Sequence, residues 1–283
     1  MKKSYLICLV CVLCFSVIFS AASAQDFTEI PPYGALTPMS FEGQALTENV
    51  DETMIANNDE YLQSFDSFMS MQMALNSGRI KVMYCPVIVA EYAKSLNPEY
   101  AYSSGWGIVD GFMMGVLPER AELRDSLNTA IKALREDGTL EALQEQYLAG
   151  NFDFTPAEPV EGRETLRVVV TGDYAPIDYI SVDGMPCGYN AALMQAIGDQ
   201  LGYNIEFISV DASQRFMTLT TGKADVIFLV QVQDSPSEDN SIHSPSGDQS
   251  ILITDPYLIC DDAAVALNQE TLDWINDYFA SLQ

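Results

Sequence analysis

The sequence predicts an α/β fold built around a parallel sheet. Three short runs rich in apolar and β-branched residues, at 166–170, 204–210 and 224–230, are separated by segments with helical periodicity. Short apolar runs of this kind are typical of strands that are covered on both faces. The alternation of strands with helices then favours parallel strands joined by helical crossovers.

Two helices are predicted between these strands. Asn190 is placed to cap a helix that runs through Gln200, with one apolar stripe formed by Ala191, Met194, Ile197 and Leu201. A second helix is predicted over 213–221, and Gly222 ends it. The resulting order is β-α-β-α-β.

The carboxyl ends of parallel strands are where such sheets bind ligands. In this chain those ends carry six candidate residues: Asp173, Tyr174, Ser213, Arg215, Leu229 and Gln231. An aromatic ring and a carboxylate in this position can stack on a small molecule and accept hydrogen bonds from its amine. Asp173 could equally cap the loop backbone, and Arg215 could equally be a surface helix charge.

Several short motifs occur in a characteristic order along the same region. They are Leu166-Arg167-Val168, Gly172-Asp173-Tyr174-Ala175-Pro176, Gly188-Tyr189-Asn190, Thr221-Gly222-Lys223-Ala224-Asp225-Val226 and Thr254-Asp255-Pro256-Tyr257. This order resembles the first lobe of the family 3 extracellular solute-binding proteins, the receptors of polar amino-acid ABC importers. The resemblance implies a two-lobed periplasmic-binding-protein-like fold of class II, a small-molecule ligand, and an ABC transporter permease or a sensor as partner.

The front of the chain resembles the later part of the same family. Ser77-Gly78-Arg79-Ile80 is similar to the second lobe, and the run from Ala133 to Glu141 is similar to the helix pair that ends such proteins. The halves therefore stand in reversed order. Either the chain is a circularly permuted single module, or it holds two truncated modules that each pair with another chain. An uncovered sheet edge is costly, which favours permutation.

These resemblances predict six segments. They are a signal peptide at 1–24, lobe 2 with a partly irregular N-terminal arm at 25–104, the return strand and C-terminal helices of lobe 1 at 105–150, a linker at 151–164, the core of lobe 1 at 165–267, and a C-terminal helix at 268–283. A permuted chain would join its lobes through one crossing, near 101–107.

The first residues predict export. Lys2 and Lys3 precede an apolar run that ends in Ala22-Ser23-Ala24, so we expect cleavage before Gln25, with an uncleaved anchor as the alternative. The residues before Cys8, Cys11 and Cys14 do not form a lipoprotein cleavage site. A periplasmic or secreted protein without stable membrane insertion is expected.

The net charge of −27 also limits the partners. An acidic surface repels nucleic acid and anionic membranes. It either favours cationic ligands or is a solvated, salt-tolerant surface with no specific partner. Three cysteines, Cys85, Cys187 and Cys260, remain after cleavage, so at most one internal disulfide can form.

The candidate site departs from the family in its ligand clamp. The resemblance implies an arginine after the third strand, hydroxyl groups at the end of that strand, and an aspartate after the second-lobe strand. The hydroxyl positions fall on Leu229 and Val230, the aspartate position falls near Cys85 and Pro86, and no arginine occurs between 231 and 283. We therefore expect an apolar and acidic site, with Tyr84 and Cys85 contributing from lobe 2.

Catalysis has little support in the sequence. The single histidine, His243, lies in a polar stretch at 234–250 that predicts a loop, so no Ser-His-Asp set is available. Cys/His metal spacing and phosphate-binding glycine motifs are not seen, and no metal or cofactor is expected. Three hypotheses remain: a solute-binding protein, a degenerate module used for protein–protein interaction, and an enzyme of carboxylate type that depends on Asp173.

Other expectations concern local structure. We predict one long strand over 106–116 and a core stripe formed by Phe65, Phe68, Met69, Met73 and Leu75. The last helix, at 269–282, is expected to cover a sheet edge or to dock a partner.

Overall fold

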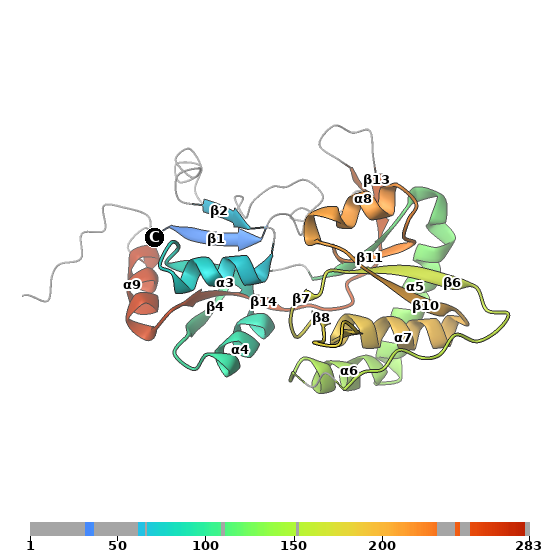
Figure 1. Ribbon diagram of the computed structural model, residues 1–283, viewed down its shortest axis with the longest axis horizontal. Helices are drawn as coiled ribbons and strands as arrows, with labels where there is room; N and C mark the ends of the chain where they lie inside the picture. Colours follow the sequence, from blue (N-terminus) through green and yellow to red (C-terminus); the bar gives the residue numbers. More distant parts are fainter. Residues whose placement is uncertain are drawn as a thin grey trace, which may run out of the picture.

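The computed structural model describes residues 32–36, 62–65, 67–108, 111–150, 153–230, 241–243 and 250–280. These residues form two lobes, each built on its own sheet, and a small three-stranded sheet (Figure 1). The leader predicted at 1–24 lies outside the described residues. No helix in the described ranges is long and apolar enough to cross a membrane.

Lobe 1 contains a six-stranded sheet. Its order is β10 (Asn204–Ser209), β6 (Thr165–Val170), β11 (Val226–Val230), β5 (Met113–Val116), β13 (Ser250–Ile253) and β12 (Ser241–His243). β6 pairs in parallel with β10 and β11, as the apolar runs predicted. β5 and β13 run antiparallel to their neighbours.

Helices cover both faces of this sheet. α5 (Ala121–Glu136) and α7 (Tyr189–Leu201) pack on one face, and α6 (Thr139–Tyr147) packs against both helices. The 3₁₀ turns Pro118–Arg120 and Ala212–Gln214 precede α5 and α8 (Arg215–Thr220). α8 covers the opposite face. Because side chains alternate along a strand, Val168 joins the core under α7 while Val169 joins the core under α8.

The front segment completes the sheet that the rear segment begins. β5 lies between β11 and β13 of the same chain, and α5 lies against α7. The guanidinium of Arg120 also lies 3.4 Å from the carboxylate of Asp225. The pairing between the two halves is therefore intramolecular in this structure.

Lobe 2 contains a five-stranded sheet in the order β2 (Leu62–Phe65), β1 (Tyr33–Leu36), β3 (Val82–Pro86), β14 (Asp261–Ala266) and β4 (Ala101–Ile108). β1 pairs in parallel with β2 and β3. α3 (Phe68–Asn76) and α4 (Val87–Leu96) pack on one face, and α9 (Gln269–Ala280) packs on the other through Leu272 and Ile275. The last helix thus covers a face of this sheet, whereas we expected it to cover an edge or to dock a partner.

Two strands of lobe 2 were not predicted. β1 lies in the arm that we expected to be irregular, directly after Pro31-Pro32, and β2 lies shortly before α3. Both strands have only four residues, which is too short for a period to be recognised in the sequence.

The chain crosses between the lobes twice. The single strand predicted over 106–116 is wrong, because β4 and β5 belong to different sheets. The single crossing is wrong as well, because β14 pairs with β3 and β4, so residues 254–260 also pass between lobes. The two crossing segments meet where the Phe112 nitrogen donates to the Leu258 oxygen at 2.7 Å.

Gly111 makes this approach feasible. Its φ is +111°, and a Cβ at this position would lie 2.9 Å from the Leu258 carbonyl oxygen. A side chain here would therefore strain the backbone and separate the crossing segments.

Three further local expectations are corrected. α7 begins at Tyr189 with Gly188 as its N-cap, so Asn190 lies inside the first turn with a buried side chain and does not cap the helix. Met69 and Met73 are 67% and 65% exposed, and the buried stripe of α3 is Phe68, Met71, Ala74 and Leu75. β12 forms within the stretch expected to be a loop.

The linker is fixed to lobe 1 by side-chain contacts. The Phe154 ring lies between the rings of Tyr147 and Phe207, each 6.4 Å away between centroids. The Asn204 side chain accepts from the Val160 nitrogen at 2.8 Å and donates to the Val160 and Arg163 carbonyls.

Candidate functional site

The carboxyl ends of the two parallel strand sets face each other. Tyr174 follows the carboxyl end of β6 in lobe 1, and Phe68 follows that of β2 in lobe 2. Their rings meet edge to face, with centroids 5.7 Å apart and an interplanar angle of 73°. Both residues are nearly buried, and they share one core cluster with residues of both lobes. An edge-to-face pair of this kind stabilises a contact by about 0.5–1.5 kcal/mol beyond the buried area.

A buried carboxylate holds the loop that carries Tyr174. Asp178 accepts hydrogen bonds from the backbone nitrogens of Thr171 and Gly172 at 3.1 and 3.2 Å, and from the Thr171 hydroxyl at 3.3 Å. β7 (Asp173–Tyr174) then pairs with β8 (Asp178–Ile180), which pairs with β9 (Pro186–Cys187). The position of Tyr174 is thereby fixed relative to lobe 1.

The carboxyl end of β11 has an unusual backbone. Leu229 has a φ of 58°, in the left-handed region that a leucine rarely adopts, and it is the only non-glycine residue with positive φ in the described chain. Its nitrogen donates to the Tyr257 hydroxyl oxygen at 3.3 Å. Residues held in such conformations concentrate at binding sites, where the surrounding structure supports the strain.

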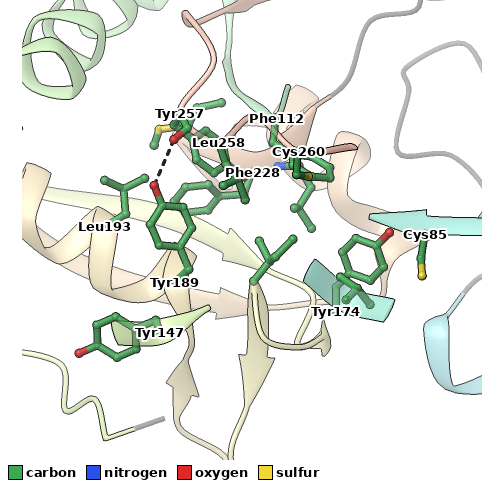
Figure 2. Close-up of a cluster of buried hydrophobic side chains, with 14 of the residues drawn as sticks. Cys85, Phe112, Tyr147, Tyr174, Tyr189, Leu193, Phe228, Tyr257, Leu258 and Cys260 are labelled. Atoms are coloured by element: carbon green, nitrogen blue, oxygen red, sulfur yellow. Dashed lines mark hydrogen bonds between the residues drawn. The ribbon is translucent and has the colours of Figure 1, made fainter. Parts of the chain in front are cut away.

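Tyr257 connects this strand end to the crossing segment. Its carbonyl oxygen accepts from the Tyr189 hydroxyl at 3.1 Å, shown by the dashed line in Figure 2. Its nitrogen donates to the Phe112 carbonyl at 2.9 Å. Burial raises the pKa of the Tyr257 hydroxyl, and Arg215 lies close enough to oppose this shift electrostatically.

The two predicted polar residues of lobe 1 have different environments. Ser213 is exposed in the turn before α8. Arg215 is only 1% exposed, with its guanidinium 5.1 Å from the centre of the Phe216 ring. The surface role that we considered for Arg215 is therefore excluded. Gln231 lies outside the described residues, and only the backbone of Asp173 is described.

The two predicted residues of lobe 2 lie on opposite faces of β3. Cys85 belongs to the same core cluster as Tyr174 (Figure 2). Tyr84 packs on the face covered by α9, with its ring 5.7 Å from that of Tyr33. Neighbouring residues of a strand point to opposite faces, so this strand does not bring both side chains to one site.

An acidic group with an unusual pKa lies close to Cys85. Burial and the neighbouring charge of Asp261 raise the pKa of Asp262 to about 6. Burial, followed by the charges of Asp262 and Cys260, raises the pKa of the Cys85 thiol. Within the described ranges, no group of three or more His, Cys, Asp or Glu side chains is arranged to hold a metal ion.

The site is therefore mainly apolar, with buried polar groups behind it. Sequence reasoning identified Tyr174 and Leu229 at the sheet edge but missed Phe68, Asp178 and Tyr257. The Tyr257 motif was visible in the sequence. No sequence signal could pair Phe68 with Tyr174, because they lie far apart along the chain and in different lobes.

Two α/β lobes joined by paired crossing segments define a two-lobed binding-protein fold. Residues 166–282 match the family of bacterial extracellular solute-binding proteins, family 3, which confirms the resemblance for this segment. The family consists of binding proteins and not of enzymes. Among curated proteins, none matches this chain.

This chain is similar to several solved structures. A periplasmic substrate-binding protein of an ABC transporter from Coxiella burnetii is 11% identical, with 88% of this chain and 91% of that chain covered and a TM-score of 0.43. A putative L-cystine ABC transporter protein from Listeria monocytogenes is 10% identical, with 89% of each chain covered and a TM-score of 0.42. A putative LysR family transcriptional regulator from Pseudomonas aeruginosa is 12% identical, with 94% of this chain and 78% of that chain covered and a TM-score of 0.43.

Proposed function

We propose that this protein is an extracytoplasmic solute-binding protein that captures a small amino-acid-like or cationic ligand between its lobes. The proposal rests on one observation. The carboxyl ends of the parallel strands in the two lobes face each other where Tyr174 contacts Phe68. The family of residues 166–282 supports the same function. The ligand would then be delivered to an ABC importer or a sensor after export and removal of residues 1–24.

The ligand class follows from charge and surface chemistry. The chain has a net charge of −27, which attracts cations, while Tyr174 offers an aromatic ring. The ligand site would comprise Tyr174, Leu229 and Cys85, with Arg215 behind them and Asp173, Ser213, Gln231 and Tyr84 as further candidates. A ligand with a cationic group and an apolar part fits this set best.

The test is a thermal-shift screen of the full chain with amino acids, short oligopeptides and polyamines. A ligand that binds only the folded state raises the melting temperature, by an amount that depends on its concentration relative to Kd. Tyr174→Leu should abolish that shift. Tyr147→Leu is the matched control, because Tyr147 is similarly buried but lies at the end of α6. No shift with any of these compounds would contradict the proposal.

One observation favours a second candidate function. The Tyr174 ring is already covered by Phe68, as expected if the module has lost small-molecule binding and serves protein–protein interaction. In that case the thermal-shift screen stays negative, and the purified chain retains a protein partner through size-exclusion chromatography.

We also propose that the chain is a circularly permuted binding module. Its support is the intramolecular position of β5 between β11 and β13. A rearranged chain, with residues 165–283 placed before residues 25–150 and joined by a glycine-serine linker, should fold with the same circular dichroism spectrum. An insoluble or unfolded rearranged chain would contradict the permutation.

A further inference from the structure

The contact between Phe68 and Tyr174 connects the two lobes through side chains at the carboxyl edges. We propose that Phe68 is an intramolecular occupant of the solute site, which holds the lobes together until a solute displaces it. The closing role of Phe68 is independent of the proposed function. Only displacement by a solute rests on that function.

Phe68 moves with lobe 2. It is the first residue of α3, and the Ser67 hydroxyl accepts from the Ser70 nitrogen at 3.1 Å to cap this helix. α3 also packs on β1, β2 and β3 through its buried stripe. The Phe68 ring is therefore anchored to the body of lobe 2.

Tyr174 moves with lobe 1. Its strand pairs with β8, and Asp178 fixes the preceding turn through the Thr171 and Gly172 nitrogens. Since both rings are held by their own lobes, they separate when the lobes separate. The 5.7 Å contact thus couples the exposure of Tyr174 to the opening of the lobes.

The apolar character of the contact between Phe68 and Tyr174 determines which solutes can take the place of Phe68. Both rings are uncharged, Tyr174 is 2% exposed and Phe68 is 6% exposed. A solute that replaces Phe68 must offer Tyr174 an apolar or flat group of similar size, because a purely charged group would lose hydration without compensation. This requirement narrows the ligand class to amphipathic solutes with a ring or a broad aliphatic part.

The experiment compares the full-length chain with Phe68→Ala and Phe65→Ala. Phe65 is the matched control, because it is 5% exposed and its ring is covered by Arg79 within lobe 2. Small-angle X-ray scattering reports lobe separation, and hydroxyl-radical footprinting read by mass spectrometry reports exposure of Tyr174. Phe68→Ala should give a measurable increase in the radius of gyration and a severalfold increase in the oxidation of Tyr174, whereas Phe65→Ala should leave both unchanged.

An unchanged radius of gyration in folded Phe68→Ala would overturn the proposal, even if Tyr174 became more exposed locally. If Phe68→Ala fails to fold, Tyr174→Leu removes the other ring and must give the same increase in the radius of gyration. Failure of that variant to open the lobes also overturns the proposal.

A second measurement separates this inference from the proposed function. The wild-type chain and Phe68→Ala are titrated with L-arginine, L-tryptophan and spermidine by calorimetry. We expect a Kd at least tenfold lower in Phe68→Ala for any probe that binds. Open lobes without binding of any probe would support the closing role of Phe68 and contradict solute binding. Equal affinity in both proteins would contradict displacement of Phe68.

Discussion

The hydroxyl oxygen of Tyr257 lies 3.3 Å from the backbone nitrogen of Leu229 and accepts its hydrogen bond. Both residues are buried, so no solvent replaces this acceptor when the hydroxyl is removed. A residue from the crossing segment thereby supports the only described non-glycine residue with positive φ.

Tyr257→Phe should therefore destabilise the protein by about 1–3 kcal/mol, because it leaves a buried N–H without an acceptor. Denaturant unfolding measures this change. The control is Tyr100→Phe, which removes a hydroxyl bonded to exposed Asn76 and should cost about 1 kcal/mol or less. Equal losses in both variants would mean that the Leu229 bond has no special role.

A second prediction concerns the buried amide of Asn190. Its side chain is fully buried, and neither its nitrogen nor its oxygen has a hydrogen-bond partner among the described residues. Asn190→Leu should raise the free energy of unfolding by about 1–3 kcal/mol, since it removes the desolvation cost of an unpaired amide. A lower melting temperature in Asn190→Leu would instead indicate that a buried water satisfies the amide.

A third prediction concerns the two ion pairs of Asp225, of which the one with Arg120 connects the two halves of the chain. Asp225 lies 3.0 Å from the Arg167 guanidinium and 3.4 Å from that of Arg120. Burial alone would raise the pKa of Asp225, but hydrogen bonds and charge from Arg167 lower it below its ordinary value. Its contribution to stability is therefore present at neutral pH and is lost as the pH falls through the folded-state pKa.

Asp225→Asn should cost about 1.5–3 kcal/mol at pH 7 and much less at pH 2–3, measured by denaturant unfolding across this range. Asp125→Asn is the control, because its carboxylate is exposed and its pairing with Arg124 should contribute about 0–1 kcal/mol. A loss in Asp225→Asn that does not depend on pH would contradict the role of the charge.

The fourth prediction concerns Asp262, whose contribution to stability depends on pH in the opposite direction to that of Asp225. The folded-state pKa of Asp262 is raised to about 6, so the protonated carboxyl is favoured in the fold. The contribution of the protonated Asp262 carboxyl to stability is fully present below the unfolded-state pKa, near 4. It is lost as the pH rises through about 6. Asp262→Asn should thus stabilise the protein at pH 7, on the order of 1–3 kcal/mol, and should change little at pH 4. Asp261→Asn should give part of the same gain by removing a neighbouring negative charge.

The sequence predicted those parts of the fold whose pattern is local. The runs at 166–170 and 224–230 form β6 and β11, and the predicted stripe of Ala191, Met194 and Ile197 lies on the buried face of α7. β14 was placed in the wrong lobe, because an apolar strand does not encode which sheet it joins. β1 and β2 were missed because four residues show no period.

The candidate site was predicted less completely, for a related reason. Tyr174 and Leu229 could be placed at strand ends, because that position follows from the order of the elements. The burial of Arg215 and the contact of Phe68 with Tyr174 depend on how two lobes pack together. The local amino-acid composition does not predict such contacts between distant parts of the chain.

The pairing of Phe112 with Leu258 determines how the protein can bend. Since the two crossing segments are tied to each other by backbone hydrogen bonds at this point, neither can slide along the other. If the lobes rotate, we expect the backbone torsions on either side of this pair to absorb the rotation. Its amides should exchange with solvent more slowly than those of the segments that they connect.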